Sequence, residues 1–251
     1  MIKYSVIIPV LNGEKELPSL LDSIDAQKKI DRSELEVIVG LSPRTTDSTR
    51  RVAESYGCII VDGGMPAKGR NNAAKEARGR YYFFKDADSP FPHDNFLNEV
   101  VHEFDKRGLD VATTLYYAYT TKNGFAKWRY DKWIGVFANG ATLKAENTDN
   151  PLMMNFMVAR KHVHEALTPK GFREDLEFAE DAEYAKRAKA AGFRFGVLKD
   201  CKPVGFSMRK LESSPLAEIV WLFKNTYFNA GRALGHEFVR GKSIIPYWEK
   251  S

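Results

Sequence analysis

The alternation of short apolar runs with helical segments along the N-terminal part of the chain most strongly constrains the fold. The runs are rich in β-branched and aromatic residues, which is typical of strands that are buried on both faces of a sheet. Between them, apolar residues three and four positions apart predict amphipathic helices. This pattern predicts a Rossmann-like α/β fold with a mostly parallel sheet, right-handed crossovers and helices on both faces. The four predicted strands are Tyr4–Val10, Leu35–Leu41, Cys58–Val61 and Tyr81–Phe84.

Two carboxylates one residue apart, Asp86 and Asp88, follow the fourth run. In open α/β sheets, ligands bind at the carboxyl ends of the strands, where these acids are expected. Neighbouring acids repel each other unless a cation or a proton joins them, and Mg²⁺ is commonly shared between one or two carboxylates and a substrate phosphate. The pair therefore indicates a metal–diphosphate site. An Asp-rich turn that only caps the strand is the alternative, and it is favoured when Asp-x-Asp is considered alone.

A helix predicted over Gly69–Arg80 precedes the aromatic strand and changes that balance. Arg70 lies at the start of this helix, where backbone N–H groups and a guanidinium favour a phosphate. The order Gly-Arg-Asn-x-Ala-Ala, Ala-Arg-Gly, apolar strand and Asp-Ala-Asp is far more specific than any of its parts. This order resembles the family-2 glycosyltransferases, which are inverting enzymes of the GT-A fold. The resemblance implies a nucleotide-sugar donor.

The opening strand and the loop after it also resemble the nucleotide side of that family. The segment from Ser5 to Asn12 (SVIIPVLN) matches the first motif. The match implies that Pro9 and Asn12 contact the donor. Together with Arg70 at the phosphates, these residues belong to the donor-binding set that the resemblance implies.

The second strand departs from the family pattern. Relatives end this strand with two acids and then Gly-Ser-x-Asp-x-Thr, whose tail is matched here by Asp47 and Thr49. Ser42 and Pro43 stand where the two acids would be. In the family the first acid helps to hold the base of the nucleotide, so the resemblance gives Ser42 that donor-side position. Pro43 offers no side-chain hydrogen bond and Ser42 offers only a hydroxyl, so recognition of uridine does not carry over.

The acid pair Glu180-Asp181 resembles the Glu-Asp motif of the family, whose Asp is the catalytic base. The pair opens a predicted helix that ends at Gly192. Acidic residues also favour helix N-termini because of the helix dipole, and this structural explanation is preferred for the pair alone. Together with the upstream motifs, the resemblance implies that Asp181 removes the acceptor proton and that Glu180 lies on the acceptor side. It also implies that Asp88, with Asp86, holds Mg²⁺ or Mn²⁺ against the donor diphosphate.

These motifs predict the metal-dependent transfer of a single sugar from a nucleotide-diphosphate sugar to an acceptor hydroxyl, with inversion. The Gln-x-x-Arg-Trp motif of processive synthases does not occur in the sequence, which favours single transfer over polymerisation. A sugar-1-phosphate nucleotidyltransferase is one alternative, but it would need a Gly-rich N-terminal phosphate loop that Gly13 alone does not supply. A non-catalytic glycan- or nucleotide-binding protein derived from a transferase is the other alternative, since Ser42 and Pro43 replace the family acids.

The sequence after the aromatic strand is less specific. The pattern predicts a helix over Asp94–Lys106, a strand over Val111–Tyr119 and, within Asn150–Lys161, a strand that resembles the acceptor-side strand of the family. Phe125–Phe137 mixes aromatic and basic residues, which suits packing or contact with sugars, bases or lipid headgroups. An apolar stripe with flanking basic residues predicts an amphipathic helix near the C-terminus.

The domain organisation follows from these elements. A chain of 251 residues with 43% hydrophobic content can bury a large core. We expect a single GT-A catalytic domain over residues 1–210. Within it, residues 1–92 would form the nucleotide-sugar-binding half and residues 93–210 the acceptor-binding half. A C-terminal helical extension would follow over residues 211–251.

The composition limits the partners. A net charge of +5 and a pI of about 9.0 favour anionic partners. We expect a nucleotide-diphosphate sugar donor, a glycan or lipid-linked acceptor and contact with an anionic membrane surface, but no nucleic acid. The two cysteines lack metal-ligand spacing, which suits a reducing compartment. No signal peptide and no apolar run of about 20 residues is visible, so we expect a cytoplasmic protein, with peripheral attachment to the inner face of the membrane as an alternative.

Overall fold

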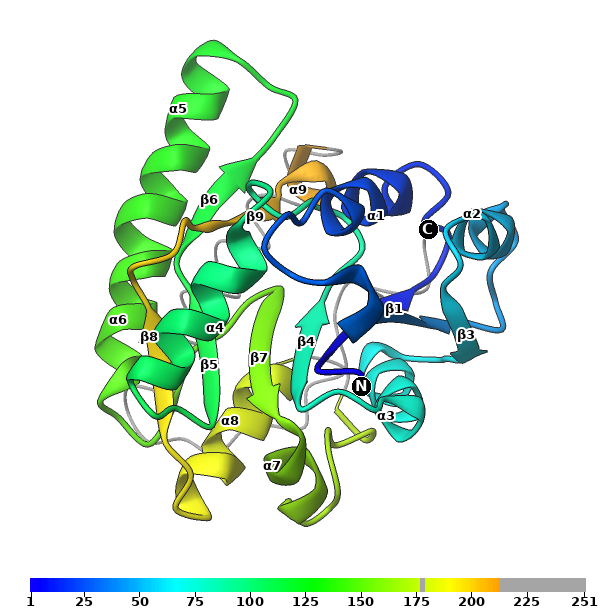
Figure 1. Cartoon of the computed structure of the whole chain (residues 1–251). Coiled ribbons are helices and arrows are strands. Elements are labelled where there is room, and N and C mark those ends of the chain that lie inside the picture. Colours follow the sequence, from blue (N-terminus) through cyan, green and yellow to red (C-terminus); the bar gives the residue numbers. More distant parts are fainter. Residues whose placement is uncertain (177–178, 213–251) are drawn as a thin grey trace.

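The computed structural model describes residues 1–176 and 179–212 and shows a central β-sheet between two layers of helices (Figure 1). β7 runs antiparallel to both of its neighbours, and the other neighbouring strands are parallel. The prediction of a mostly parallel sheet is therefore confirmed. In spatial order the seven strands are β3 (Ile59–Asp62), β2 (Leu35–Leu41), β1 (Tyr4–Val10), β4 (Tyr81–Lys85), β7 (Phe156–Arg160), β5 (Val111–Thr114) and β8 (Phe195–Leu198).

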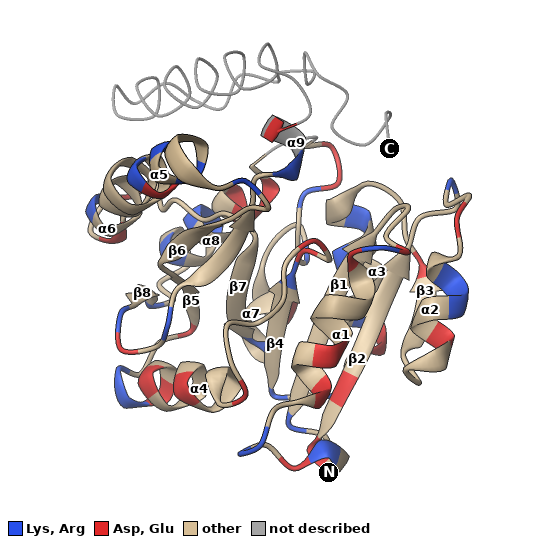
Figure 2. Cartoon of the chain, turned by 90° about the horizontal axis from the view of Figure 1, so that it is seen from above, with Lys and Arg blue, Asp and Glu red and all other residues tan. Residues whose placement is uncertain are grey.

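Two hydrophobic cores lie on the two faces of this sheet, which Figure 2 shows from above together with the helices around it. Alternate residues of a strand enter different cores because successive side chains point to opposite faces. Val6 and Phe83 belong to the first core, and their neighbours Ile7 and Phe84 belong to the second. The first core is covered by α1 (Leu17–Asp25), α2 (Thr49–Ser55) and α4 (Phe96–Lys106), and the second by α3 (Pro66–Glu76), α7 (Lys161–Ala166) and α8 (Glu180–Ala190).

The helix predicted over Gly69–Arg80 is present as α3, with both ends shifted towards the N-terminus. It begins at Pro66 because the proline ring fixes a helical φ and the N–H group that it lacks would be unpaired there. It ends before Arg78, whose backbone N–H donates to Glu36 Oε1 at 2.6 Å instead of continuing the helix. The early start places Arg70 well inside the helix.

The strand predicted over Val111–Tyr119 is divided at Leu115. Its first half is β5 of the large sheet, and its second half is β6 (Tyr116–Tyr119), which pairs with β9 (Val204–Ser207) in a separate two-stranded sheet. The Tyr116 N–H donates a hydrogen bond to Asn139 Oδ1, and Asn139 Nδ2 donates one to the Tyr116 carbonyl, both at 2.9 Å. The chain therefore leaves the large sheet at this point. The remaining elements are a 3₁₀ turn (Arg32–Glu34), α5 (Gly124–Lys132), a π-helical segment (Trp133–Ala138), α6 (Asn139–Glu146) and α9 (Arg209–Glu212).

None of the helices found in residues 1–176 and 179–212 is long and apolar enough to cross a bilayer. The C-terminal helical extension predicted over 211–251 lies outside the described residues from residue 213 onward, and it stays a prediction. The division of the domain into a donor half and an acceptor half at residue 92 also stays a prediction.

Candidate active site at the carboxyl ends of the strands

The loops after β1 and β2 meet on the predicted donor side. Asn12 has a φ of +49°, which Asn adopts more readily than most residues, and its Oδ1 accepts a hydrogen bond from the Thr46 N–H at 2.8 Å. Ser42 is buried, and its backbone N–H donates to the Val10 carbonyl at 2.9 Å. Pro9 lies near the end of β1. The structure thus places Pro9, Asn12 and Ser42 at the carboxyl ends of two neighbouring strands.

Asp47 and Thr49 fix these two loops to each other. The Gly13 N–H donates to Thr49 Oγ1 at 2.7 Å, and the Glu14 N–H donates to Asp47 Oδ2 at 3.0 Å. Burial raises the pKa of Asp47, but hydrogen bonds from Thr49 and from the Glu14 N–H outweigh it and keep that pKa below its usual value. The Asp47-x-Thr49 motif therefore has a structural role, because it joins the loop after β1 to the loop after β2.

Arg70 lies between carboxylates from both sides of the predicted site. Its Nη2 donates to Asp86 Oδ1 at 2.7 Å, and its Nη1 donates to Glu180 Oε1. The guanidinium carbon lies 5.4 Å from the ring centroid of Phe172, and the whole residue is 5% exposed. Burial opposes the charged form, but the attraction of Glu180 and Asp86 prevails and raises the pKa of Arg70. Residues far apart in sequence thus meet at one guanidinium.

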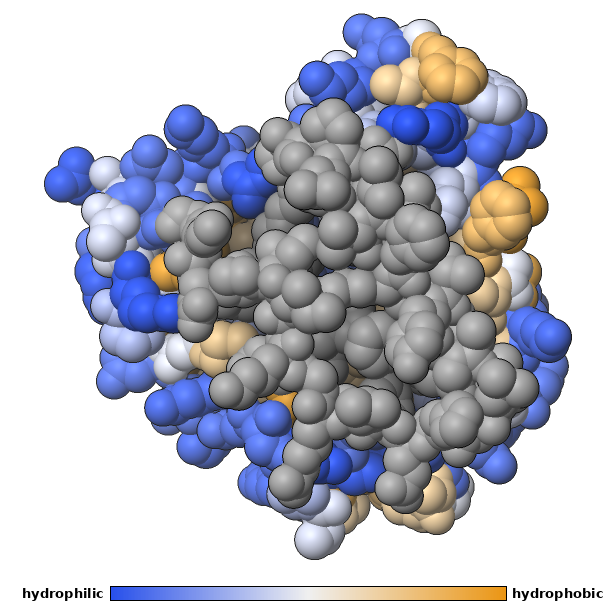
Figure 3. Space-filling view, turned by 180° about the vertical axis from the view of Figure 1, so that it is seen from behind, coloured by the Kyte–Doolittle hydropathy of each residue, from blue (hydrophilic) through white to orange (hydrophobic). Residues whose placement is uncertain are grey.

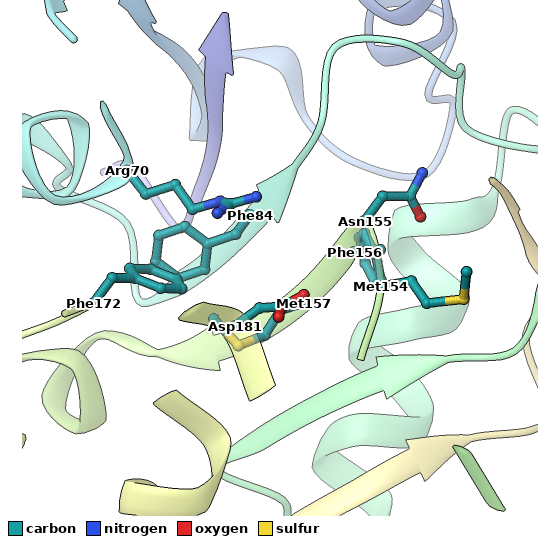
Figure 4. Close-up of a pocket in the computed structure, with 8 residues that line it drawn as sticks. All are labelled: Arg70, Phe84, Met154, Asn155, Phe156, Met157, Phe172 and Asp181. Carbon is teal, nitrogen blue, oxygen red and sulfur yellow. The ribbon is translucent and has the colours of Figure 1, made fainter. Parts of the chain in front are cut away.

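Asp181, the predicted base, is the second residue of α8 and lines a small pocket with Arg70 (Figure 4). Burial and the neighbouring Glu180 carboxylate raise the pKa of Asp181 to about 8, against the opposing effect of Arg70. A group whose pKa lies near neutral is well suited to accept a proton. The other residues that line the pocket are Phe84, Met154, Asn155, Phe156, Met157 and Phe172.

Lys85 is a buried cation beside the site to which the sequence interpretation gave no role. It is the last residue of β4, and its Nζ donates to the Asp86 carbonyl at 3.0 Å and to Ser89 Oγ at 2.8 Å. Burial lowers the pKa of Lys85 to about 8, and Asp88 and Asp86 oppose this effect. The sequence feature that could have indicated this role is a lysine that ends an aromatic run directly before two acids. Through Ser89, which donates to the Gly205 carbonyl at 2.7 Å, Lys85 fixes the turn that carries both aspartates.

Asp86 and Asp88 offer two carboxylates to a divalent cation. Within the described part of the chain, no group of three or more His, Cys, Asp or Glu side chains is arranged to hold a metal. Mg²⁺ commonly takes one or two carboxylates and completes its coordination with water and phosphate oxygens. The pair therefore fits a cation that is shared with a diphosphate. Because Arg70 already contacts one oxygen of Asp86, such a cation would share that carboxylate with the guanidinium.

Comparison with known families agrees with these motifs. The model described as glycosyl transferase family 2 matches residues 5–167, which include β1, β4 and both aspartates after β4. The chain belongs to glycosyl transferase family 2. The match ends before α8, so the assignment of Glu180 and Asp181 depends on their local motif and on the geometry described above.

Curated relatives of this family-2 chain act on poly(ribitol-phosphate), according to their names. The poly(ribitol-phosphate) beta-N-acetylglucosaminyltransferase TarS of Staphylococcus aureus is 35% identical over 119 residues, which cover 44% of this chain and 20% of TarS. The poly(ribitol-phosphate) beta-glucosyltransferase of Bacillus spizizenii is 30% identical over 95 residues, which cover 34% of this chain and 15% of the relative. The chain therefore spans about a fifth or less of the length of these relatives.

Solved structures share the fold of this family-2 chain. TarS 1–349 of S. aureus in complex with UDP superimposes with a TM-score of 0.64 at 22% identity, over 82% of this chain and 60% of that one. The mannosyltransferase PcManGT of Pyrobaculum calidifontis, in complex with GDP-Man and Mn²⁺, also superimposes with a TM-score of 0.64. Its identity is 20%, and the match covers 79% of this chain and 55% of that one. These similarities confirm the GT-A type of α/β fold for the described domain.

Proposed function

We propose that this chain transfers a sugar from a nucleoside diphosphate sugar to a hydroxyl group of an acceptor. The observation that carries the proposal is the group of side chains around Arg70, which binds Asp86 from the donor side and Glu180 from the acceptor side. Asp181 lines the adjacent pocket together with Arg70. A donor and an acceptor that meet in this pocket would lie between the proposed metal ligands, Asp86 and Asp88, and the proposed base, Asp181.

In the proposed reaction, Asp181 accepts the proton of the acceptor hydroxyl while that oxygen attacks the anomeric carbon. The nucleoside diphosphate leaves from the opposite face of the sugar, so a single displacement inverts the configuration. Mg²⁺ or Mn²⁺ held by Asp86 and Asp88 would offset the negative charge of the leaving diphosphate. Asp181 must be ionised to accept the proton, and its pKa of about 8 favours this form at slightly alkaline pH.

The donor class is proposed from the relatives and from the loops after β1 and β2. The structures of TarS contain UDP or UDP-GlcNAc, and that of PcManGT contains GDP-Man and Mn²⁺. Pro9, Asn12 and Ser42 lie where such a nucleotide would bind. Because Ser42 offers a hydroxyl in place of a carboxylate, uridine and guanosine donors both belong in the first panel.

The test is donor turnover by the full chain with UDP-GlcNAc, UDP-glucose and GDP-mannose, with Mn²⁺ and with EDTA. We expect nucleoside diphosphate release from one donor, faster with an acceptor and lost in EDTA. A glycan, a lipid-linked sugar and poly(ribitol-phosphate) form the acceptor panel, the last because the curated relatives are named for it. Donor binding without any turnover would favour the non-catalytic alternative, and formation of a nucleotide sugar from sugar-1-phosphate would favour the nucleotidyltransferase.

The metal assignment has its own prediction. Asp88 lies in the turn after β4 and is half-buried, so Asp88→Ala should leave the fold intact. It removes one of two carboxylates from the proposed cation, and metal-dependent binding of the donor should be lost. Calorimetry with UDP and with GDP, each with and without Mn²⁺, measures this effect. Equal Mn²⁺-dependent affinity in the variant and the wild type would contradict the assignment.

We further propose that the protein works at the cytoplasmic face of a membrane. The net charge of +5 favours an anionic surface, and the lipid-linked class of acceptor would be presented there. In the described residues, α5 and the π-helical segment expose aromatic side chains beside basic ones. The predicted C-terminal amphipathic helix is the second candidate for this contact.

A further inference from the structure

Arg70 occupies an unusual position for a residue that was expected to meet a phosphate. Its two Nη groups bind Asp86 and Glu180, which are 16 and 110 residues away in the sequence. The guanidinium also lies against the ring of Phe172. Because a guanidinium donates in a rigid planar fork, two carboxylates held by it are fixed relative to each other.

The N-terminus of α8 needs such an anchor. Ala179, the residue before the helix, has a φ of +59°, and its side chain makes no capping hydrogen bond. Oδ1 of Asp181 accepts a hydrogen bond from the Ala182 N–H at 2.7 Å, so this carboxylate is oriented by the first turn itself. The orientation of the Asp181 carboxylate therefore depends on the position of the first turn of α8. The hydrogen bond between Arg70 and Glu180 holds that turn in place.

We propose that Arg70 is a positioning residue that joins Asp86 of the donor side to the Glu180–Asp181 pair, and so sets the base at a fixed place relative to the bound donor. This inference depends on the proposed glycosyl transfer. Asp86 is a proposed metal ligand and Asp181 the proposed base, so the Arg70 bridge (Asp86–Arg70–Glu180) connects the two groups whose separation matters most. A misplacement of about 1 Å in such a pair can cost about 10²-fold in rate.

The charge of Arg70 gives the bridge a second effect. Arg70 lowers the pKa of Asp181, whereas Glu180 and Asp86 raise it. Tyr116, a buried phenol bonded to Thr113, is a further titratable group that interacts with Asp181. The loss of the positive charge at Arg70 should therefore move the ionisation of the base to higher pH.

Arg70→Lys is the main test variant, because it keeps the charge but replaces the planar fork by a single ammonium. We expect kcat to fall about ten- to a hundredfold while the KM for the donor stays within about twofold of wild type. Arg107→Lys is the matched control. Arg107 also joins two carboxylates, those of Glu103 at 3.0 Å and Glu146 at 2.6 Å, and the proposed reaction uses neither. This control should retain the kcat of the wild type.

Two further variants separate positioning from packing. In Arg70→Gln, the acid limb of the pH profile of kcat/KM should shift to higher pH, and in Arg70→Lys it should stay in place. If Arg70 acts through Glu180, the double variant Arg70→Lys/Glu180→Gln should be no slower than the slower single variant. A raised donor KM with unchanged kcat would overturn the proposal in favour of direct phosphate binding. Additive losses in the double variant would overturn it as well.

If no donor is turned over, the proposed function is rejected, but the Arg70 bridge is not. Amide hydrogen exchange then tests the bridge directly. The Glu183 N–H bonds to the Ala179 carbonyl at 3.0 Å in the first turn of α8. Its exchange, and that of Ala182, should be faster in Arg70→Lys than in wild type and unchanged in Arg107→Lys. Equal exchange in all three proteins would overturn the Arg70 bridge.

Discussion

Asp181 and Asp86 are both carboxylates of one small site, yet their surroundings differ. Asp86 shares an ion pair with Arg70 at 2.7 Å, whereas the pKa of Asp181 is raised to about 8 by burial and by Glu180. A carboxylate held in an ion pair and a buried carboxylate with a raised pKa are suited to different tasks. Asp86 fits the binding of a cation, and Asp181 fits the acceptance of a proton.

Asp181→Asn separates donor binding from chemistry. The amide keeps the size of the side chain but lacks basicity, so transfer should fall by about 10²–10⁴-fold, the usual contribution of a positioned general base. Donor affinity measured with Mn²⁺ should stay near that of the wild type, because the proposed donor contacts come from the ends of β1, β2 and β4. Glu180→Gln should lose less activity. Wild-type transfer by Asp181→Asn together with an inactive Glu180→Gln or Glu174→Gln would place the base elsewhere.

The raised pKa of Asp181 also predicts a change of stability with pH. Its pKa is about 8 in the folded protein and near the ordinary value of 3.8 in the unfolded chain, so the folded state binds the proton more tightly between these values. The free energy of unfolding should therefore fall as pH rises towards 8. Between pH 6 and pH 8, Asp181→Asn should lose less of this free energy than the wild type, by about 1–2 kcal/mol. Denaturant unfolding of both proteins at the two pH values measures the difference, and parallel losses would contradict the prediction.

At the scale of elements, the position of α3 depends on close backbone contact with β2. A Cβ atom on Gly40 would lie 2.6 Å from the carbonyl oxygen of Gly69, which immediately precedes Arg70. Gly40→Ala should therefore push α3 away from the sheet and lower the free energy of unfolding by about 1–3 kcal/mol. It should also reduce activity, because Arg70 moves with the helix. Urea unfolding and donor turnover are the two measurements.

Gly140→Ala is the control for this prediction. Gly140 lies within α6, and an added Cβ would meet nothing within 4 Å. Alanine favours a helix more than glycine does, so the variant should gain up to about 1 kcal/mol and keep its activity. If Gly40→Ala were as stable as Gly140→Ala, the close packing of α3 on β2 would not be required.

The sequence predicted elements best where a single periodic signal sufficed. Apolar runs predicted β1 and β2 at their observed bounds, because strands buried on both faces are apolar along most of their length. The division of Val111–Tyr119 could not be predicted from a local pattern. It depends on a hydrogen bond with Asn139, and α5 and the π-helical segment lie between Tyr119 and Asn139 in the chain. The antiparallel direction of β7 was also beyond a local pattern, because strand direction is set by the path of the chain around the sheet.

The candidate site shows the same division between local and distant information. Asp86, Asp88, Glu180 and Asp181 were recognisable because each pair lies at a strand end or helix start that the sequence marks. The contact of Arg70 with Glu180 was not predictable, because a short motif carries no information about a partner 110 residues away. The roles of all these residues stay predictions until the variants are measured.

At the scale of the whole molecule, the large sheet joins the two sides of the site. β4 lies between β1 on the proposed donor side and β7 on the proposed acceptor side, and it ends at Lys85, directly before Asp86. Parallel strands bring their carboxyl ends to one edge, so loops from β1, β2 and β4 meet there. Loops that differ in sequence can thus change the donor or acceptor while the sheet stays the same.

The last prediction concerns the surface of the whole molecule. Phe125, Trp128 and Phe137 are 72%, 54% and 67% exposed, and the exposed basic residues Arg129 and Lys132 lie beside them. We call these five residues the aromatic–basic face. In Figure 3 hydrophobic groups stand next to strongly hydrophilic ones at the upper right, the corner that α5 occupies. Such a mixture of aromatic and basic side chains suits the headgroup layer of an anionic bilayer.

We therefore expect the full chain to co-sediment with vesicles that contain an anionic lipid and not with purely zwitterionic ones. Binding should weaken with salt, because charges near a surface are screened within about 10 Å at 0.1 M ionic strength. The variant Arg129→Gln/Lys132→Gln should bind several-fold more weakly at low salt while turning over the donor normally, since neither residue lies in the proposed site. Unchanged vesicle binding by this variant would move the contact to the predicted C-terminal helix. Absence of binding to anionic vesicles at low salt would contradict membrane attachment altogether.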